Sequence, residues 1–534
     1  MPGYRVFRST ALLTAIVLAP GLFYLAGASR TAAAQDEPAA SPTKLILHTR
    51  KQVETKAGTG RYHSVTQTVE WDPHKTAIVI CDMWDKHWCA GATKRVGEMA
   101  PRMNEVVVAA RKQGVRIIHC PSDTLDFYNN SAARLLAQEA PVLKTDPPLE
   151  RWCRIDSERE GKLPIDDSDG GCDCLPQCKN YKAWSREIAA IKIESGDAVT
   201  DSGEAFFLMR KLGLENVIVM GVHTNMCVLG RPFSIRQLVY QGQNVLLMRD
   251  MTDTMYNSRK APFVHHSTGT DLVVEHIEKN WCPTITSTDF LGGREFRFSD
   301  DNRPHVAFVV AEDEYKTEQS LPAFAARYLG KEFRTSFIFG SDTERNDLPG
   351  LEGLPSADVL FVSVRRRVLP RAQLDWIRKF IAAGKPIVGI RTASHAFSLR
   401  DESPLPAGLE SWPTFDADVL GGHYMGHHGP GSKVAIALAD RAQENPLLAR
   451  VDLSQLIGNG HLYKVRPLAS TAKPILIGTI PEHEAEPIAW TNTNKYGGRV
   501  FYTSLGHIND FQEEAFNQLL LNALRWATNI SPNQ

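Results

Sequence analysis

The sequence predicts an α/β protein with two three-layer α/β/α domains whose sheets are mostly parallel. Its 534 residues exceed the length of one ordinary domain. In both halves, short apolar runs alternate with helical patterns, an order that indicates a parallel sheet covered by helices on both faces. The hydrophobic content of 43% and the charged content of 23% are typical of globular proteins.

The first half shows these patterns: strands at 76–81, 115–119, 217–220 and 245–248, and helices at 99–113 and 202–212. The second half repeats the alternation: strands at 305–310, 359–362, 387–390 and 499–503, and helices at 321–329, 371–383 and 512–527. We therefore expect one domain at 43–298, a polar linker at 299–304 and a second domain at 305–530. The first domain carries a Cys-rich insertion at about 150–180.

The N-terminus has the pattern of a targeting segment. Arg5 and Arg8 precede an apolar run at 11–28, and small residues follow it. This order is typical of a secretory signal peptide, expected at 1–34, with a flexible leader at 35–42. The chain is thus expected to be exported, to the periplasm or outside the cell. Membrane anchoring by an uncleaved N-terminal segment is the alternative.

Charge and cysteine content limit the partners. The net charge of -1 gives no electrostatic footprint for nucleic acid. Nine cysteines lie between Cys81 and Cys282. Four of them are close in a loop-like segment: Cys153, Cys172, Cys174 and Cys178. In an oxidising compartment, disulfides are expected. A zinc site is the alternative, because four thiols can close a tetrahedral shell, although the spacing fits no familiar zinc pattern. The pairing cannot be read from the sequence.

Cys227 is the most informative residue. It follows the apolar run at 217–220 and a Gly-containing turn, where a helix is expected to begin. Unpaired backbone N–H groups and the positive end of the helix dipole both favour a thiolate there. The position predicts a nucleophile with a lowered thiol pKa.

Two further residues complete a candidate triad. Asp82 ends the strand at 76–81, and Lys192 lies in the apolar run at 189–193. Catalytic residues of parallel sheets collect at the carboxyl ends of the strands. Asp82 can take the thiol proton and later return it, and Lys192 can stabilise the thiolate. Singly, each has an ordinary structural interpretation: a helix cap, a solvated lysine or a small buried hydrophobe.

Together these motifs resemble the isochorismatase-like cysteine hydrolases, which include nicotinamidases and other small amidases. The resemblance covers 75 to about 290. It depends on IVICDMW at 78–84, on Ile191-Lys192 with the later Asp197 and Asp201, and above all on GVHTNMCV at 221–228.

The resemblance implies a Cys227, Asp82 and Lys192 triad that needs no cofactor. It also implies a cis peptide bond between Val222 and His223, which aims the amides of His223 and Cys227 at an oxyanion. The reaction implied is acyl transfer through a thioester. Family members that cleave the vinyl ether of isochorismate lack this Cys, so its presence favours an amidase with a small-molecule amide substrate.

The sequence also departs from the nicotinamidase pattern. Asp123 can match an expected metal ligand, but Leu125 stands where a His is expected, so such a metal site is not expected and the metal content is left open. Trp84 and His87 either shape the substrate pocket or pack in the core. Arg231 either binds a substrate carboxylate or forms a salt bridge with a neighbouring acid.

The second half resembles the ThuA-like (trehalose-utilisation) domain of the class I glutamine-amidotransferase-like fold. The resemblance covers about 305–530 and depends on GKPIVGIR at 384–391 and VFYTSLGH at 500–507. This half holds no Cys, which excludes thiol chemistry there. Ser394 could act with His507, but Asn509 stands where an acidic residue is expected.

The histidines of this half form a second candidate site. His423, His427 and His507 are expected to line a polar pocket or a metal site, with a metal-free glycine-rich loop as the alternative. The resemblance suggests a carbohydrate-related ligand. Two alternatives to the hydrolase remain: a non-catalytic small-molecule or carbohydrate-binding protein, and a metal-dependent carbohydrate-processing enzyme with its site in the second domain. Relatives of the first domain often self-associate, and the sequence leaves the oligomeric state open.

Overall fold

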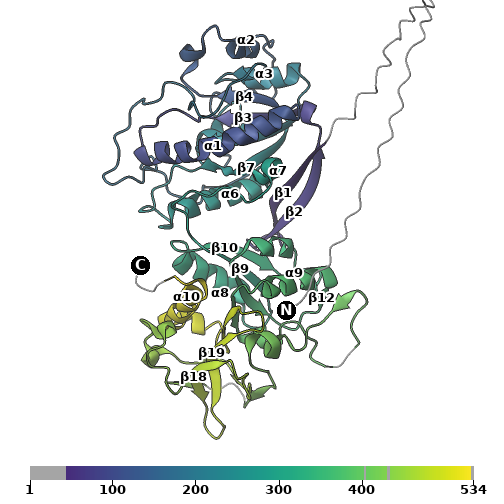
Figure 1. Cartoon of the computed structure of the whole chain (residues 1–534), viewed down its shortest axis with the longest axis vertical. Coiled ribbons are helices and arrows are strands. Elements are labelled where there is room, and N and C mark those ends of the chain that lie inside the picture. The colour runs from purple at the N-terminus through teal and green to yellow at the C-terminus, as the bar shows by residue number, and fades with distance from the viewer. Residues whose placement is uncertain (1–43, 402–403, 430–432, 531–534) are drawn as a thin grey trace, which may run out of the picture. The chain divides into compact units, whose positions relative to one another are not determined.

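The computed structural model describes residues 44–401, 404–429 and 433–530, and they form two α/β domains, each with one eight-stranded sheet (Figure 1). This confirms the predicted fold class. The signal peptide at 1–34 and the leader at 35–42 lie outside the described residues.

The first sheet has the strand order β2-β1-β8-β7-β6-β3-β4-β5. Its strands are β1 (Leu45–Glu54), β2 (Tyr62–Trp71), β3 (Thr76–Cys81), β4 (Arg116–Cys120), β5 (Ala198–Val199), β6 (Asn216–Val222), β7 (Asn244–Asp253) and β8 (Thr284–Ile285). The strands from β8 to β5 pair in parallel, and the β1–β2 hairpin pairs antiparallel at the edge. This hairpin lies outside the strands predicted from the sequence.

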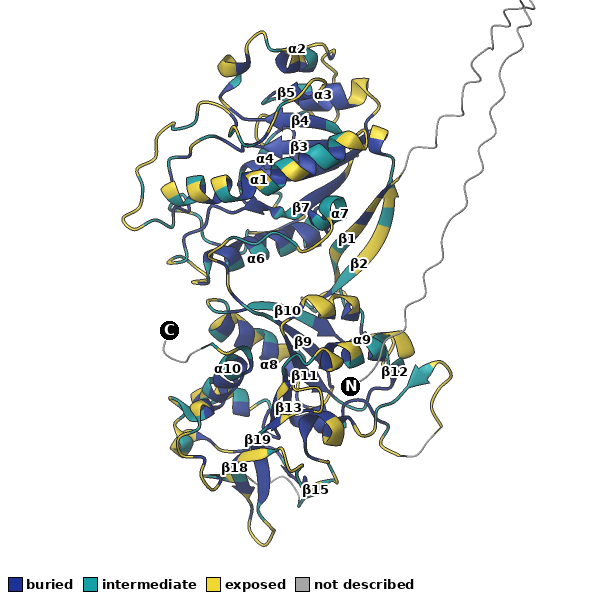
Figure 2. Cartoon of the chain, in the orientation of Figure 1, coloured by how far each residue is buried: buried dark blue, intermediate teal, exposed yellow. Residues whose placement is uncertain are grey.

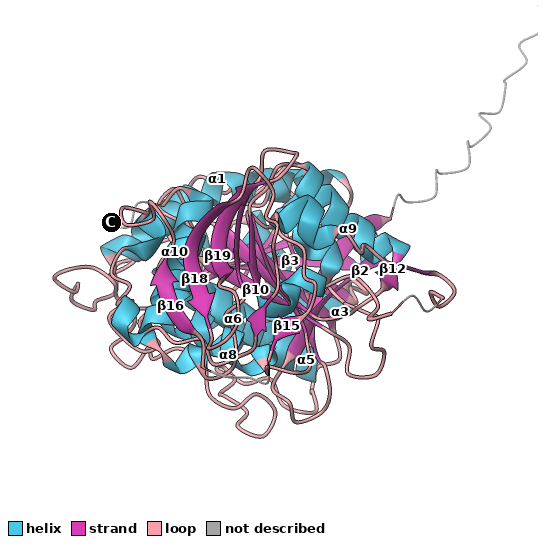
Figure 3. Cartoon of the chain, turned by 90° about the horizontal axis from the view of Figure 1, so that it is seen from below, coloured by secondary structure: helices cyan, strands magenta, loops and turns pink. Residues whose placement is uncertain are grey.

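Helices cover both faces of this sheet, as Figures 2 and 3 show. They are α1 (Ala90–Lys112), α2 (Ala132–Gln138), α3 (Glu204–Lys211), α4 (Cys227–Gly230), α5 (Ile235–Tyr240), α6 (His266–Asn280) and α7 (Thr288–Leu291). Strand β3 is entirely buried, and its residues alternate between two cores. Ile78 and Ile80 pack with α1, whereas Ala77 and Val79 pack with α3 and α6. An apolar run buried on both faces is typical of a central parallel strand.

The path of the chain creates a crevice beside β3. From β3 the chain continues to β4 and β5 on one side, and it then builds β6, β7 and β8 on the other. In open parallel sheets, ligands bind where the strand order reverses, outside the carboxyl ends of the strands. Asp82 follows β3 and Cys227 follows β6, so the topology brings both to this edge.

The second sheet has the strand order β10-β9-β11-β13-β20-β19-β18-β16. Its strands are β9 (His305–Ala311), β10 (Arg334–Phe339), β11 (Val359–Val364), β13 (Ile387–Ile390), β16 (Ala435–Leu438), β18 (Lys473–Thr479), β19 (Glu486–Thr493) and β20 (Arg499–Thr503). The first five in the order are parallel, and the rest pair antiparallel. The longer helices are α8 (Thr317–Phe324), α9 (Arg371–Ala382) and α10 (Glu514–Thr528), and two short antiparallel pairs join β12 (Leu369–Pro370) to β14 (Leu409–Glu410) and β15 (His427–His428) to β17 (Leu462–Tyr463).

Helix α1 begins nine positions before the predicted start at residue 99. Gly91, Gly97 and Pro101 lower its intrinsic helix propensity. The buried residues Val96 and Met103 lie one above the other with Met99 on the face toward the sheet, and this packing outweighs the propensity.

No helix among residues 44–401, 404–429 and 433–530 combines the length and the apolar character that crossing a membrane requires.

Candidate active site

Asp82 and Cys227 lie at the carboxyl ends of neighbouring central strands. Asp82 is fully buried and has a φ of 49°, and its backbone N–H donates to Cys120 O at 3.0 Å. Its Oδ1 accepts a hydrogen bond from the Ser122 N–H at 2.8 Å. Cys227 is 8% exposed and begins the four-residue helix α4. A non-glycine residue held at positive φ at such an edge is a frequent mark of a functional site.

Arg231 supplies the positive charge of this cluster. It follows α4 directly, and its Nε lies 3.5 Å from Asp82 Oδ2. Its side chain is only 14% exposed, and its guanidinium lies 5.5 Å from the ring centroid of Trp152. Of the two roles expected for Arg231, the structure shows the salt bridge with an acid, and that acid is the candidate base.

Lys192 does not belong to the cluster. It is exposed, and its Nζ donates to the Ala189 carbonyl, three residues earlier in the chain, at 2.8 Å. The reason lies in the secondary structure, because the run at 189–193 forms a turn and not a strand. The strand beside β4 is β5, which begins only at Ala198. The structure therefore does not bring Lys192 to the cluster, and the cationic side chain that it places beside Asp82 is Arg231.

Burial dominates the charge state of the pair. It raises the pKa of the Cys227 thiol well above its usual value; the carboxylate of Asp82 raises it further, and Arg231 lowers it. Burial also raises the pKa of Asp82, against the effect of Arg231. The predicted lowering of the Cys227 pKa is not found, because burial and the Asp82 carboxylate outweigh the effect of Arg231. The guanidinium of Arg231 therefore lies beside two acids, Cys227 and Asp82, and burial favours the state in which only one of the two is ionised.

The turn before Cys227 has the backbone form that the resemblance implies. The peptide bond between Val222 and His223 is cis. Its hydrogen bonds run from Thr224 N to Asp253 O, and from Met226 N and Val228 N to His223 O. The amides of His223 and Cys227 are not among these donors. Burial lowers the pKa of His223 well below its usual value, so the imidazole is neutral.

Trp84 and His87 form a buried aromatic wall beside this turn. The ring of Trp84 stacks on Trp184 at 4.5 Å between centroids, and its Nε1 donates to Ser122 O at 3.0 Å. His87 meets the ring of His223 edge-on at 4.9 Å, and burial lowers its pKa to about 4. Of the two expected roles, packing in the core is the one shown, although the wall ends at the turn that leads from Val222 to Cys227.

A pocket of about 420 Å³ adjoins the cluster, and Arg231, Asp123 and Asp201 are among the residues that line it. Arg231 also lies 3.8 Å from Asp123 Oδ2, so it connects the pocket with the buried pair. Leu125 begins the short 3₁₀ helix Leu125–Tyr128. No group of metal-ligating residues includes Asp123 in the described part of the chain.

A buried ionic cluster supports the neighbouring strand end. His119, at the end of β4, contacts Glu187 Oε2 through Nδ1 at 2.8 Å and Asp197 Oδ2 through Nε2 at 3.3 Å. Arg111 Nη2 donates to the same Asp197 oxygen at 2.7 Å. The two carboxylates outweigh the effect of burial and raise the pKa of His119 to about 9.

This cluster predicts a stability that falls with rising pH. His119 binds its proton more tightly in the folded than in the unfolded chain, where its pKa is 6.5. The contribution is complete below pH 6.5 and is lost as the pH approaches 9. The free energy of unfolding of the first domain should fall by about 1 kcal/mol between pH 6.5 and about 7.5, a range in which unfolded cysteines, with a pKa of about 8.5, remain mostly protonated.

Urea unfolding across this pH range measures the effect. The variant His119→Asn should be less stable at pH 6.5 and should lose most of the decline. The exposed His48→Asn is the matched control and should keep it. An equal slope in the His119→Asn variant and the wild type would refute a charged His119.

In the described part of the second domain, the predicted histidines do not come together as a set of metal ligands. The side chain of His423 is 56% exposed, and it contacts Asp416 Oδ1 at 3.2 Å. The ring centroids of His427 and His461 are 4.2 Å apart with the rings tilted by 38°, and His507 meets the ring of Tyr315 edge-on at 5.7 Å. Within the described residues they form no group of three metal ligands.

Arg391 directly follows β13, three residues before Ser394. It has a φ of 40°, it is buried, and its guanidinium lies 4.1 Å from the ring centroid of Tyr315. Ser394 Oγ contacts His395 Nδ1 at 3.2 Å, and no hydrogen bond joins it to His507 in the described chain. The pairing of Ser394 with His507 is therefore not found. Arg391 was not predicted as a site residue, because the pattern after the strand indicated Ser394 as the candidate nucleophile.

Two family models match the chain: isochorismatase domain at residues 76–265, and trehalose utilisation (ThuA) at residues 305–527. No curated protein matches it.

Solved structures resemble each half. A thua-like protein from Bacteroides uniformis is 18% identical, covering 45% of this chain and 97% of its own, with a TM-score of 0.34. A cysteine hydrolase from Pseudomonas syringae is 17% identical, covering 41% and 93%, with a TM-score of 0.26. The N-carbamoylsarcosine amidase from Thermoplasma acidophilum is 12% identical, covering 40% and 96%, with a TM-score of 0.22.

Proposed function

The chain joins an isochorismatase-like cysteine hydrolase domain to a ThuA-like domain, and from this premise we propose that it hydrolyses a C–N (amide) bond of a small molecule at Cys227. The observation that carries the proposal is the buried cluster of Cys227, Asp82 and Arg231 at the strand-order reversal of the first sheet. Nucleophile, base and cation meet there beside a pocket.

Acylation begins with a proton transfer inside the cluster. Asp82 takes the thiol proton, and the negative charge moves to the sulfur, where Arg231 stabilises it. The raised pKa values of both acids support this exchange, because either can hold the shared proton. The sulfur attacks the amide carbon, and the amides of His223 and Cys227 stabilise the oxyanion.

The protonated Asp82 then donates its proton to the departing nitrogen, the C–N bond breaks, and an acyl thioester remains on Cys227. In the second half of the reaction, Asp82 takes a proton from a water molecule while the water oxygen attacks the thioester carbon. The acid leaves, and the proton returns to the sulfur. Arg231 stays charged throughout, since a guanidinium does not titrate in this range.

The pocket supports a small, polar substrate. Carboxylates at Asp123 and Asp201 and the guanidinium of Arg231 lie along its wall. A substrate amide that enters here meets Arg231 before it reaches the sulfur. Arg231 therefore both orients the substrate and sets the charge of the nucleophile.

The ThuA-like domain is assigned an auxiliary role with a carbohydrate-related ligand. The support is the edge after β13, where Arg391 lies among Tyr315 and Tyr463, since aromatic and hydrogen-bonding groups suit a polyhydroxylated ligand. We also propose export, which depends on the N-terminal pattern of Arg5, Arg8 and the apolar run at 11–28.

Release of ammonia or amine from a panel of small primary and N-substituted amides tests the hydrolase. The wild type should turn over at least one of them, and the Asp82→Asn variant should not. Asn keeps the size of Asp and can still accept from the Ser122 N–H, but it cannot take a proton. Turnover by Asp82→Asn at the wild-type rate would exclude the proposed base.

A further inference from the structure

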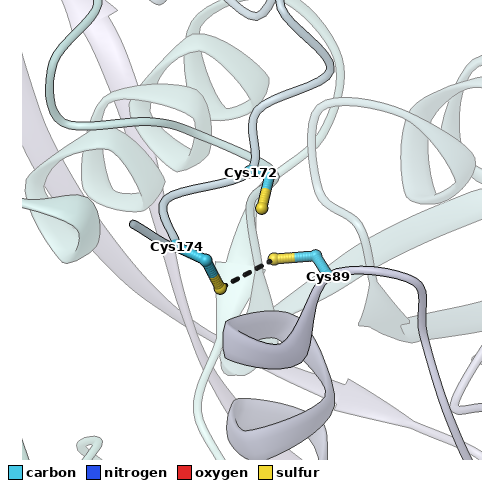
Figure 4. A group of neighbouring side chains, drawn as sticks. All are labelled: Cys89, Cys172 and Cys174. Atoms are coloured by element: carbon cyan, nitrogen blue, oxygen red, sulfur yellow. Dashed lines mark hydrogen bonds between the residues drawn. The ribbon is translucent and has the colours of Figure 1, made fainter. Parts of the chain in front are cut away.

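Three thiols from distant parts of the sequence meet at the start of α1. Cys89 is the residue before the helix, and Cys172 and Cys174 come from the Cys-rich insertion (Figure 4). Their sulfur atoms all lie within 4.8 Å of one another. Of the residues that the structure describes, these are the group of three or more that could hold a metal ion. All nine cysteines of the chain are free, so the structure does not contain the disulfides that we expected.

The spacing of the sulfurs suits a tetrahedral thiolate site. The Sγ atoms of Cys89 and Cys174 are 3.8 Å apart. Four sulfurs at about 2.3 Å from one zinc ion are about 3.8 Å from each other, from the geometry of a tetrahedron. The two thiols therefore already stand at the separation that a shared ion would impose.

A fourth thiol lies beside these three. Cys178 packs against the cluster of Cys89 and Cys172, and its sulfur accepts from the Ala90 N–H at 3.5 Å. The Gly91 N–H donates in the same way to the Cys174 sulfur at 3.2 Å. Backbone N–H groups that donate to sulfur favour thiolates, and these two come from the first turn of a 23-residue helix.

Cationic side chains hold the other face of the cluster. Arg95 Nη1 donates to Asp173 Oδ2 at 2.8 Å, and Arg259 donates to the carbonyls of Asp173 and Cys174 at 3.1 and 3.0 Å. Four thiolates around a divalent ion carry a net charge of −2, and Arg259, which contacts only backbone carbonyls here, and the helix N-terminus lie beside them to offset part of it.

We propose that Cys89, Cys172, Cys174 and Cys178 bind a structural Zn²⁺ ion. The ligands are sulfur only and form a closed shell, which is typical of structural and not of catalytic zinc. Each thiol gives up its proton on binding, so four protons are released for one ion. Cys153, which the sequence placed with this group, is not among the three thiols that lie together, and its N–H donates to the carbonyl of Gly230, the last residue of α4, at 2.7 Å.

The ion would fasten the insertion to the active site. Met226, the residue before the nucleophile, packs against the thiol cluster. Arg95, which contacts Asp173 of the insertion, also donates through Nε to Asp253 Oδ2 at 2.8 Å. Asp253 O in turn accepts from the Thr224 N–H of the oxyanion turn at 2.8 Å. One ion would therefore connect the start of α1, the insertion and the turn before Cys227.

Metal analysis of the purified full chain tests the proposal. Protein prepared under reducing conditions, without chelator and with Zn²⁺ supplied, should hold about one zinc per chain. Replacement of Zn²⁺ by Co²⁺ should give the strong sulfur-to-cobalt absorption of a tetrahedral thiolate site. The variants Cys89→Ser and Cys174→Ser should lose the zinc and the absorption. Cys153→Ser, a buried cysteine of the same domain, should keep both.

Cys178→Ser provides a second test if the buried variants fail to fold, because Cys178 is only partly buried and lies in a loop. It should weaken zinc binding while the far-UV circular dichroism stays unchanged. A zinc content at background level in the folded wild type, or the same zinc content per chain in the wild type and the variants, would overturn the proposal. So would peptide mapping that finds a disulfide between any two of the four cysteines.

Discussion

Replacement of Cys227 by Ala is expected to reduce the kcat for amide hydrolysis by at least about 10³-fold, because no other group can form the thioester. The variant should still fold, since Cys227 is a small side chain at the start of a four-residue helix. KM should change little, because the pocket contacts come from Arg231 and its neighbours. Steady-state kinetics on the amide found in the panel measure both constants.

Cys282→Ala is the matched control for this variant. Cys282 is buried in the same core cluster but stands near β8, away from the strand-order reversal. It should keep the wild-type kcat and lose only some stability. Comparable kcat values for Cys227→Ala and Cys282→Ala would contradict a nucleophilic role of Cys227.

Replacement of Arg231 by Ala is expected to lower kcat/KM by about 10² to 10³-fold, whereas Lys192→Ala should retain it. Without the guanidinium, no ion pair to Asp82 remains among the described residues to balance the negative charge that the cluster shares. The pKa of Asp82, already raised by burial, should rise further, and the acid limb of the pH profile should move to higher pH.

The Arg231→Lys variant separates the effect of the positive charge on kcat/KM from the effect of the guanidinium geometry. A lysine keeps the positive charge and should recover part of kcat/KM, but it lacks the forked donor geometry. The Lys192→Ala variant tests the family-derived expectation directly, since Lys192 Nζ contacts only its own turn at Ala189. A loss in Lys192→Ala as large as that in Arg231→Ala would show that the exposed lysine moves into the site.

The sequence pattern correctly indicated where the candidate site residues lie when those residues follow a fully buried strand. The apolar runs before Asp82 and Cys227 are buried along their whole length, so their ends could be read from the pattern. Lys192 was misplaced because the strand that it was expected to end is absent at 189–193, and β5 is only two residues long. Arg231 had a visible signal, its position four residues after Cys227 in a helical register, but nothing local identified Asp82 as its partner.

The prediction that the cysteines of the insertion lie close together holds for two of them. Cys172 and Cys174 do meet, but their partner Cys89 lies far away in the chain and becomes a neighbour only when the insertion packs on the start of α1. Long-range contacts of this kind leave no periodic pattern. The same holds for Arg391, whose neighbour Tyr315 comes from the segment after β9.

Intact-mass analysis of the enzyme during turnover tests the central claim most directly. After rapid acid quenching with the hydrolysed amide, the wild type should carry the mass of its acyl group, and peptide mapping should place this group on Cys227. The Cys227→Ala variant should carry none. An acyl group on another residue, or steady turnover in Cys227→Ala, would contradict the account.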